Sequence, residues 1–362
     1  MKVLVMGGTQ FNGLALVREL VRTGHDVSVL NRGKTEAPLP RPVRRLYADR
    51  TDPEALQAAL AGEEFDCVQD ISAYRPDDVK QMLEIFRGRV GHYIFASSTV
   101  IYQPSNRLPI TEDHPLDRSE LQNGYGMNKI LCEDLLVAEH RKTGFPATIA
   151  AFSMVFGPRN ILPDREQRMF MRILKGRPVM IPGDGTTLGQ VCHVDDEARA
   201  LRMMMGQPIT FGKRYNLTGN DLFSDEGYAD TFAAVLEREI EKVFIPAAIM
   251  DELYSGKMVL GGDSMKVETQ IRSDFDARTT ALFQVSRIIQ RLAPNLHDWN
   301  RSVIFGIDRL VQDVGWRPEY TFRAAVEQTW QWMQSEGLTD TLDFDFSFED
   351  DLLEEIRKRG QA

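Results

Sequence analysis

Tyr125 and Lys129 are the two side chains in this sequence best suited to proton transfer. They open a stretch that is predicted to be helical from Tyr125 to about Arg141. Residues four apart lie on one face of a helix, so the phenol and the ammonium group are expected to point the same way. Because a nearby cation stabilises a phenolate, such a tyrosine can give or take a proton near neutral pH. An isolated pair of this kind also fits a packed tyrosine beside a surface lysine, so its interpretation depends on its context.

Ser98 and Thr99 place two hydroxyl groups directly after a buried strand that is predicted over His92–Ser97. Ligands of α/β sheets bind at the carboxyl ends of the strands. A serine at this edge can hydrogen-bond a substrate oxygen that changes between an alcohol and a ketone, so Ser98 is a candidate catalytic residue and both hydroxyls are candidate substrate-binding groups. The alternative for Ser98 is that its side chain caps the turn after the strand.

A glycine-rich turn, Met6-Gly-Gly-Thr-Gln-Phe-Asn-Gly13, follows the first predicted strand and opens the first predicted helix. Glycine permits a tight turn and lets the backbone approach a pyrophosphate, whose charge then faces the N-terminus of the helix. This context predicts a dinucleotide site, and its expected residues are Gly7, Thr9, Gln10, Phe11 and Asn12. Because Gln10 replaces the usual middle glycine, its side chain is expected to alter the phosphate approach or to fill the space of one bound water.

The second predicted strand ends at Asn31 and Arg32, where an acidic residue would bind the ribose 2′-hydroxyl of NAD. A guanidinium suits a 2′-phosphate, so the expected cofactor is NAD or NADP, with NADP favoured. The alternative is that Arg32 is an exposed loop residue. Asp49 is a candidate to hydrogen-bond the adenine amine, and the adjacent Arg50 is a candidate cofactor-binding residue. The end of the fourth predicted strand is expected to lie along the cofactor, through Ile71, Ser72 and Ala73. Tyr125 and Lys129 are further candidate cofactor contacts, and Lys129 could hydrogen-bond the nicotinamide ribose.

Strand and helix signals alternate over residues 1–152 and must position these groups. Apolar runs predict strands at Lys2–Met6, Asp26–Asn31, Arg44–Ala48, Asp66–Ser72, His92–Ser97 and Ala147–Phe152. Strands that alternate with helices imply a parallel sheet covered on both faces. The predicted fold class is therefore α/β, a Rossmann-type doubly wound parallel sheet with a smaller mixed α/β C-terminal substrate lobe.

The expected domains are an NAD(P)-binding domain over residues 1–152, to which some later segments return, a substrate-binding lobe over 153–340 and an acidic tail over 341–362. In the tail, the stretch from Asp343 to Glu355 carries seven carboxylates among Phe344, Phe346 and Phe348. We expect this tail to be a solvated end whose aromatic side chains dock on the body of the protein.

Composition limits the classes of function. A net charge of −10 argues against nucleic acid as the main partner. No apolar run approaches the roughly 20 residues that span a bilayer, and the start of the chain fits a buried strand better than a signal peptide. The three cysteines are isolated and form neither a metal-ligand spacing nor a disulfide framework. The sequence therefore predicts a cytoplasmic protein without a metal site or a membrane span.

The chain resembles an extended short-chain dehydrogenase/reductase of the NAD-dependent epimerase/dehydratase family. The resemblance runs from Met1 to about Gln331, and its motifs are the glycine turn, Ala48-Asp-Arg50, Phe95-Ala-Ser-Ser98, Tyr125-Gly-Met-Asn-Lys129, Val155-Phe-Gly-Pro158, Gly183-Asp-Gly185, His193-Val-Asp-Asp196 and Val314-Gly-Trp-Arg-Pro318. It implies that Ser98, Tyr125 and Lys129 perform the reversible oxidation of a sugar carbinol, usually in a nucleotide-diphosphate sugar. It also implies that Phe152 lies against the nicotinamide and that two chains pair as a homodimer.

Four departures from the family pattern qualify this resemblance. The variant Gly-Gly-Thr-x-Phe-x-Gly, with Gln10, is similar to a branch that includes chloroplast stem-loop-binding proteins, which act on RNA. Met154 and Gly189 stand where sugar-nucleotide epimerases commonly carry an Asn and an Arg for the diphosphate, and neither side chain has a donor. Thr99-Val100 stands where 4,6-dehydratases carry an acid pair, which favours epimerisation or reduction over dehydration. The substrate is expected to be another sugar derivative, or a diphosphate held by Arg159, Arg165 or Arg168.

The sequence therefore predicts an NAD(P)-dependent epimerase or ketoreductase that acts on a sugar or a sugar nucleotide, with Arg159 among the substrate-binding residues. A rival hypothesis is an RNA-binding protein that kept the fold as a scaffold, since a fold does not fix a function. A third hypothesis is a sensor that binds NADP(H) without turnover. His193 is expected to be a hydrogen-bonded structural residue.

Overall fold

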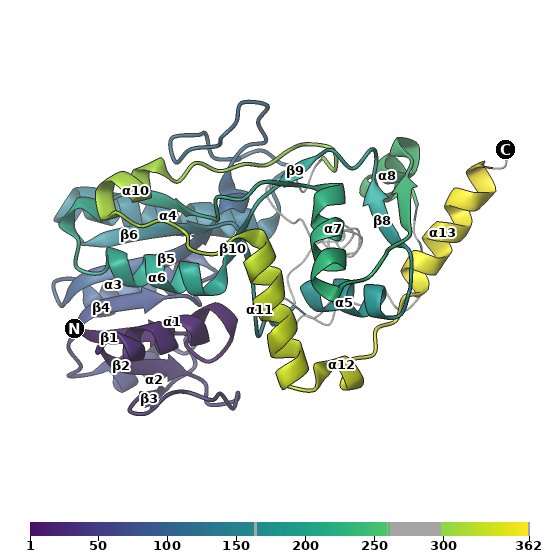
Figure 1. The fold of residues 1–362 in the computed structure, drawn as a ribbon. Coiled ribbons are helices and arrows are strands. Elements are labelled where there is room, and N and C mark those ends of the chain that lie inside the picture. Colours follow the sequence, from purple (N-terminus) through teal and green to yellow (C-terminus); the bar gives the residue numbers. More distant parts are fainter. Residues whose placement is uncertain (163–164, 259, 261–297, 361–362) are drawn as a thin grey trace.

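The computed structural model describes residues 1–162, 165–258, 260 and 298–360. Its centre is a seven-stranded sheet in the order β11-β6-β5-β4-β1-β2-β3, in which every neighbouring pair is parallel (Figure 1). The strands are β1 (Lys2–Met6), β2 (Asp26–Asn31), β3 (Arg44–Tyr47), β4 (Phe65–Asp70), β5 (Val90–Ser98), β6 (Ala147–Phe152) and β11 (Arg214–Leu217). The six strands expected in residues 1–152 are present, and β11 joins them from later in the chain.

Helices cover both faces of this sheet. One face packs against α2 (Pro53–Leu60), α3 (Pro76–Phe86) and α4 (Gly124–Thr143). The other face packs against α1 (Phe11–Arg22), α6 (Val194–Met204) and α10 (Asp308–Val314). Strands covered in this way must be apolar along most of their length, and Val3, Leu4 and Val5 of β1 are fully buried. The predicted Rossmann-type, doubly wound α/β fold is confirmed.

Helix α4 carries Tyr125 and Lys129, and local capping fixes both of its ends. At the start, the Oδ1 atom of Asn123 accepts a hydrogen bond from the main-chain nitrogen of Gly126 at 2.9 Å. At the end, Gly144 adopts a φ of 75°, a conformation that glycine takes without steric cost. The two caps therefore fix where this helix begins and ends beside the carboxyl edge of the sheet.

The described residues of the second lobe form three two-stranded sheets and several helices. The strand pairs are β7 (Met154–Phe156) with β10 (Val191–His193), β8 (Val179–Pro182) with β13 (Lys242–Ile245), and β9 (Leu188–Gly189) with β12 (Phe223–Ser224). Its helices include α5 (Glu166–Leu174), α7 (Asp225–Leu236), α8 (Ala247–Tyr254) and α11 (Phe322–Ser335). Elsewhere in the described ranges, short 3₁₀ turns occur at η1 (Thr99–Ile101) and η2 (Pro208–Thr210). The core of the second lobe includes a cluster of aromatic rings from Phe156, Phe170, Phe232 and Phe322.

The C-terminal tail forms α12 (Leu338–Thr341) and α13 (Ser347–Gly360), and Figure 1 shows α13 along the outer side of the second lobe. As expected, Phe346 and Phe348 are buried against the body of the protein. The tail is not only a solvated end, however, because the Glu349 carboxylate is also buried and forms ion pairs with Arg168 and Arg172 of α5. The two guanidinium groups offset the cost of burying this carboxylate. The sequence pattern did not predict that Glu349 is buried and paired in this way.

Cys67, Cys132 and Cys192 are all buried and free. Within the described ranges, no group of His, Cys, Asp and Glu side chains has an arrangement that could hold a metal ion. Among the described helices, none combines the length and the apolar character that a membrane span requires.

Candidate active site

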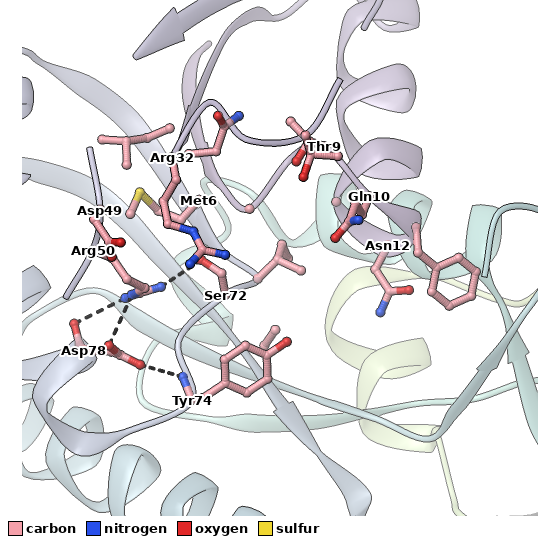
Figure 2. Close-up of a pocket in the computed structure, with 18 of the residues that line it drawn as sticks. Met6, Thr9, Gln10, Asn12, Arg32, Asp49, Arg50, Ser72, Tyr74 and Asp78 are labelled. Carbon is pink, nitrogen blue, oxygen red and sulfur yellow. Dashed lines mark hydrogen bonds and ion pairs between the residues drawn. The ribbon is translucent and has the colours of Figure 1, made fainter. Parts of the chain in front are cut away.

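A cavity of about 620 Å³ lies over the carboxyl edge of the sheet, where β1 to β6 end (Figure 2). Most of the residues predicted to bind the cofactor or to act in catalysis line this cavity, namely Gly7, Thr9, Gln10, Phe11, Asn12, Asn31, Arg32, Asp49, Arg50, Ile71, Ser72, Tyr125, Lys129 and Phe152. Four predicted residues are not part of its wall, namely Ala73, Ser98, Thr99 and Arg159.

The glycine turn closes the cavity between β1 and α1. Gly7 has a φ of 87°, and a Cβ atom there would lie 2.8 Å from the Cβ atom of Ser72. A Cβ atom on Gly13 would lie 2.1 Å from the main-chain oxygen of Gly7. Gln10 is the N-cap of α1, and its side chain makes no capping hydrogen bond. The helix therefore presents its N-terminus to the cavity, an arrangement that favours an anionic group such as a pyrophosphate.

Among the buried polar atoms of this wall, two side-chain amide atoms have no hydrogen-bond partner among the described residues. They are Oδ1 of Asn12, in the first turn of α1, and Nδ2 of Asn31, at the end of β2. The other amide atom of Asn31, Oδ1, already accepts a hydrogen bond from the Gly33 nitrogen at 2.8 Å. Buried polar groups are nearly always paired in proteins. The wall therefore fits a ligand that brings both donors and acceptors, as a dinucleotide does.

The end of the cavity beside β2 and β3 carries two cations and one carboxylate. Arg32 and Lys34 both line it, and Figure 2 shows the Arg32 side chain reaching into the cavity. The Oδ1 atom of Asp49 accepts hydrogen bonds from the nitrogen and the hydroxyl of Thr51, at 3.0 and 2.8 Å. These hydrogen bonds, with smaller contributions from Arg32 and Lys34, lower the pKa of Asp49. The carboxylate therefore stays ionised beside the two cations.

Arg50 lines the cavity, but its guanidinium group is bound to other side chains of the protein. Its Nη1 atom lies 2.8 Å from Oδ1 of Asp70 and 2.8 Å from the hydroxyl of Ser72, and its Nε atom lies 3.3 Å from Asp78. Burial acts to raise the pKa of Asp70, but the charge of Arg50 and the hydrogen bonds from Arg50 and Tyr93 outweigh it, so this pKa is lowered. Arg50 therefore forms the floor of the cavity as part of a buried ion network (Figure 2).

Tyr125 and Lys129 meet at the opposite end of the cavity, as the four-residue spacing predicts. The Lys129 side chain is buried, and its Nζ atom donates to the main-chain oxygens of Ala73 and Ala96 at 2.7 and 2.5 Å. The same atom lies 5.7 Å from the centre of the Tyr125 ring. Ala73 thus lies behind the cavity wall and holds the lysine through its carbonyl oxygen. The arrangement places an ammonium group beside a phenol at the edge of the sheet.

Ser98 lies at the end of β5, next to the cavity. Its hydroxyl oxygen accepts a 3.4 Å hydrogen bond from the nitrogen of Val100 and so caps η1, the alternative role noted from the sequence. Ser97 lines the cavity instead, and its hydroxyl donates to Glu133 at 2.5 Å. Neighbouring strand residues point to opposite sides, which separates the two hydroxyls. Thr99 is completely buried within η1.

Several residues of the cavity wall were not predicted from the sequence. They include Lys34, Tyr74, Arg75, Ser97 and Ile161. Tyr74 and Arg75 directly follow the predicted stretch Ile71–Ala73, so extending that stretch to the start of α3 would have included them. Ile161 comes from the second lobe, and no local pattern marks it. At Ser97, the sequence favoured the neighbouring Ser98 as the hydroxyl that faces the site.

Arg159, Arg165 and Arg168 were the candidates to hold a substrate diphosphate, and each contacts a protein oxygen. Arg159 forms an ion pair with Glu336, which directly follows α11, and its guanidinium lies 5.9 Å from the centre of the Trp332 ring. Arg165 donates to the main-chain oxygen of Val155 at 3.1 Å. Arg168 donates to both carboxylate oxygens of Glu349, at 2.8 and 2.7 Å. None of the three lines the cavity.

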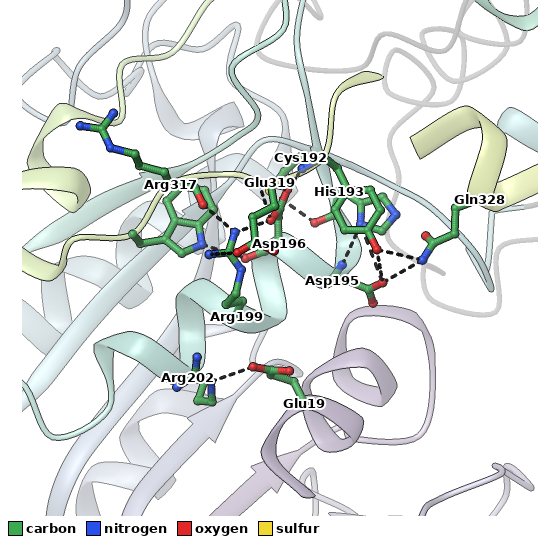
Figure 3. Close-up of polar contacts among 12 residues, drawn as sticks. Glu19, Cys192, His193, Asp195, Asp196, Arg199, Arg202, Arg317, Glu319 and Gln328 are labelled. Carbon is green, nitrogen blue, oxygen red and sulfur yellow. Dashed lines mark hydrogen bonds and ion pairs between the residues drawn. The ribbon is translucent and has the colours of Figure 1, made fainter. Parts of the chain in front are cut away.

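His193 has the structural surroundings expected for it (Figure 3). It is the N-cap of α6, and its Nδ1 atom accepts a hydrogen bond from the Asp195 nitrogen at 3.2 Å. Its ring stacks on that of Tyr320, with 3.7 Å between the two ring centres. Burial lowers the pKa of His193 against the opposing effect of Asp195 and Asp196. The side chain joins α6 to the segment before α11 and lies outside the cavity wall.

Comparison with curated proteins gives relatives of different kinds. The chain is 31% identical over 245 residues to the chloroplast stem-loop binding protein of 41 kDa b from Arabidopsis thaliana, an alignment that covers 64% of this chain and 62% of that protein. It is 25% identical over 259 residues to 2′-dehydrokanamycin reductase from Streptomyces kanamyceticus, covering 68% of this chain and 70% of that protein.

Comparison with solved structures shows the fold over nearly the whole chain. The dTDP-glucose 4,6-dehydratase of Bacillus anthracis in complex with NAD superposes with a TM-score of 0.69 at 15% identity, covering 94% of this chain and 98% of that chain. The UDP-glucose 4-epimerase of Thermotoga maritima with UDP-glucose gives a TM-score of 0.69 at 18% identity, covering 93% of this chain and 99% of that chain.

A family model matches residues 3–218, which include the glycine turn, the sheet edge and the pair Tyr125 and Lys129. This match covers more than half of the chain. The protein therefore belongs to the NAD dependent epimerase/dehydratase family.

Proposed function

We propose that this protein is an NADP(H)-dependent ketoreductase or epimerase that interconverts a hydroxyl and a keto group on a sugar. The observation that carries the proposal is that Tyr125 and Lys129 line the same cavity as the glycine turn. A dinucleotide held by that turn would extend along the sheet edge toward the phenol. The relative named 2′-dehydrokanamycin reductase supports reduction of a keto sugar as one reaction of this kind.

The cofactor would be held by groups along the whole cavity. The turn of Gly7 and the N-terminus of α1 suit the pyrophosphate. The unpaired Oδ1 atom of Asn12 suits a ribose hydroxyl of the cofactor, and the unpaired Nδ2 atom of Asn31 suits a ribose or phosphate oxygen. The cations Arg32 and Lys34 favour a 2′-phosphate on the adenosine ribose, and hence NADP over NAD. When bound, the nicotinamide supplies the hydride chemistry.

The protein side of the reaction is a proton transfer at the phenolic oxygen of Tyr125. In the reductive direction the phenol donates its proton to the oxygen of the substrate, and in the oxidative direction the phenolate accepts the hydroxyl proton. The ammonium group of Lys129 stabilises the phenolate by its charge. Ser98, which lies next to the cavity wall, would orient the substrate oxygen by donating its hydroxyl proton, because this hydroxyl only accepts the 3.4 Å hydrogen bond from the Val100 nitrogen.

The experiment that tests this function measures NADPH oxidation at 340 nm with a panel of keto sugars, with 2′-dehydrokanamycin among them. The wild-type protein is expected to turn over at least one member, and the Tyr125→Phe variant to bind NADPH without turnover. A wild-type protein that binds neither NADPH nor NADH would contradict the proposal. Binding of NADPH without turnover of any alcohol or ketone would favour the sensor hypothesis.

RNA binding is the second candidate function. It is favoured by the 31% identity to the chloroplast stem-loop binding protein. On the outer strand β3, Arg44, Arg45 and Tyr47 are exposed, and exposed cations with aromatic rings suit nucleic acid. Against it stands the net charge of −10. Because phosphate contacts release counterions, RNA binding should weaken steeply as salt rises, and a titration that finds no RNA binding at low salt removes this candidate.

A further inference from the structure

Glu133 of α4 is a buried carboxylate that joins this helix to two strands of the sheet. It follows Lys129 by about one helical turn and Tyr125 by about two, so the three side chains share one face of α4. Only 1% of the Glu133 surface is exposed. Its Oε1 atom accepts a hydrogen bond from the hydroxyl of Ser97 in β5 at 2.5 Å. Its Oε2 atom accepts one from Nε of Arg214 in β11 at 2.7 Å and another from Nη2 of the same guanidinium. The carboxylate therefore ties α4 to β5 and to β11.

Lys129 and Glu133 contact neighbouring residues of β5. The Nζ atom of Lys129 donates to the main-chain oxygen of Ala96 at 2.5 Å, and the hydroxyl of Ser97 donates to Glu133. A single contact would let the helix turn or slide about it, whereas two contacts about one helical turn apart fix both its rotation and its position along the strand. The bond from Lys129 to the main-chain oxygen of Ala73, at 2.7 Å, extends this constraint to the end of β4.

Arg214, which lies outside the cavity wall, supplies the counter-charge for Glu133. Its Nη1 atom also donates to the main-chain oxygen of Glu112, in the connection between η1 and α4, at 3.1 Å. Burial acts to lower the pKa of Arg214, but the charge of Glu133, with a smaller contribution from Tyr102, outweighs it, so this pKa is raised. Removing one partner of a buried ion pair is strongly unfavourable. The pair is therefore a lasting link between α4 and the outer strand β11.

We propose that Glu133 is a positioning residue, which through Ser97 and Arg214 holds Lys129 and the phenol of Tyr125 at the reacting end of the cavity. The proposal rests on the proposed function, because that function assigns the proton transfer to Tyr125. Glu133 lies outside the cavity wall, so it acts through the placement of α4. Ser97 lines the cavity, but its hydroxyl donates to Glu133, so its part is to hold the helix. Because misplacing a group by about 1 Å can slow a reaction about 10²-fold, turnover should depend on this link.

The first test compares the reduction of a keto sugar by the wild type, Glu133→Gln and Ser97→Ala, with kcat expressed per NADPH-binding site. Ser97→Ala breaks the link to β5 and keeps the ion pair with Arg214, so it remains informative if Glu133→Gln does not fold. We expect kcat to fall about tenfold or more in both variants, while the KM for the sugar and the Kd for NADPH stay within about twofold of the wild type. Ser97→Thr keeps the hydroxyl and should restore most of the kcat.

Asp134→Asn is the matched control. Asp134 follows Glu133 directly and pairs with Arg118 through two hydrogen bonds, at 2.9 and 2.8 Å, on the exposed side of α4. Its replacement should leave kcat unchanged, because exposed ion pairs contribute little. An unchanged kcat in Ser97→Ala, or an equal loss in Ser97→Ala and Ser97→Thr, would overturn the proposal. A raised KM or Kd with an unchanged kcat would overturn it as well, because Ser97 would then bind the ligand directly.

The second test needs no substrate. Crystal structures of the wild type and of Ser97→Ala, both with NADP⁺, would compare the place of α4 on the sheet. In the variant we expect the Nζ atom of Lys129 or the hydroxyl of Tyr125 to move by more than about 0.5 Å relative to β5, which is the tolerance of a preorganised site. Identical positions of both groups in the two structures would overturn the proposal.

The two levels of failure can be told apart. If Tyr125→Phe abolishes turnover while Ser97→Ala changes neither kcat nor the position of Lys129, the proposed function stands and only the role of Glu133 is wrong. If the wild type reduces no keto sugar and oxidises no sugar alcohol, the proposed function is wrong, and the role of Glu133 in the reaction falls with it.

Discussion

The ammonium nitrogen of Lys129 lies 5.7 Å from the centre of the Tyr125 ring. Two main-chain carbonyl oxygens, from Ala73 and Ala96, fix its position at the ends of β4 and β5. The lysine is therefore oriented by the sheet, whereas the tyrosine is oriented by the first turn of α4. The charge is thus placed where it can stabilise the phenolate before any substrate binds.

Replacing Tyr125 by Phe removes the hydroxyl and keeps the ring. We expect turnover to fall by the roughly 10²–10⁴-fold that is typical of losing a general acid or base. NADPH binding, measured by quenching of protein fluorescence, should be unchanged, because the substitution leaves the glycine turn, Arg32 and Lys34 as they are. A variant that keeps full activity on the physiological substrate would exclude Tyr125 as the proton-transferring residue.

Arg32→Ala tests the choice of cofactor. A guanidinium beside a 2′-phosphate forms charge-assisted hydrogen bonds worth about 1.5–3 kcal/mol, so the Kd for NADPH should rise about tenfold or more. The Kd for NADH should change little, because NADH lacks that phosphate. Arg41→Ala is the matched control, since Arg41 is exposed on the same connection between β2 and β3 but does not line the cavity. Equal losses for NADPH and NADH in Arg32→Ala would refute a 2′-phosphate site.

Asp70→Asn tests the ion network beneath the cavity. The folded state lowers the pKa of Asp70, so the stabilisation is complete above the unfolded-state pKa of about 3.9 and is lost as the pH falls through the folded-state pKa. At pH 7 the variant should lose about 3–5 kcal/mol of unfolding free energy, because Arg50 loses a buried partner. In urea unfolding followed across pH, the difference between wild type and variant should shrink below about pH 4.

Asp77→Asn is the control for this experiment. The Asp77 carboxylate is highly exposed and pairs with Lys80 on the surface of α3. Its replacement should leave the urea midpoint unchanged at every pH tested, since exposed ion pairs contribute little. If the loss in Asp70→Asn were the same at pH 3 and pH 7, the ionised form of Asp70 would not be its cause.

Glu349→Gln tests the attachment of the tail. Burial acts to raise the pKa of Glu349, but Arg172 and Arg168 outweigh it, so this pKa is lowered and the carboxylate is ionised. Removing its charge leaves two buried guanidinium groups uncompensated, which should cost about 3–5 kcal/mol of unfolding free energy. Glu354→Gln, on the exposed side of α13, is the control and should not change the unfolding midpoint. A similar stability of both variants would show that α13 is held by its apolar residues alone.

The sequence was sufficient to predict six strands of the sheet and half of the residues that line the cavity. The alternation of apolar residues in the strands, the glycine turn and the four-residue spacing of Tyr125 and Lys129 are local sequence patterns. Each predicts the structure correctly because the adjoining segments of the chain favour the same secondary structure. Arg50 shows the limit of this reasoning. It was placed correctly in the wall, but its ion pairs with Asp70 and Asp78 join residues far apart in the sequence, and no local pattern reports them.

The second lobe was less predictable for the same reason. Arg168 lies among apolar residues of α5 and looks like a free cation in the sequence, yet its partner Glu349 follows 181 residues later. Ser97 and Ser98 illustrate a finer limit. Both residues belong to β5, and the alternation of side chains along the strand sends the Ser97 hydroxyl to Glu133 and the Ser98 hydroxyl to the turn of η1.

The position of β11 has a consequence for the biosynthesis of the protein. This strand, Arg214–Leu217, is the outer partner of β6, so the nucleotide-binding sheet is completed only after the ribosome has made part of the second lobe. Until then, β6 is a nascent edge with unpaired N–H and C=O groups, the kind of edge that recruits strands from other chains. A fragment that stops at Phe152 would keep this edge permanently, so truncation at the apparent domain boundary should yield aggregated material.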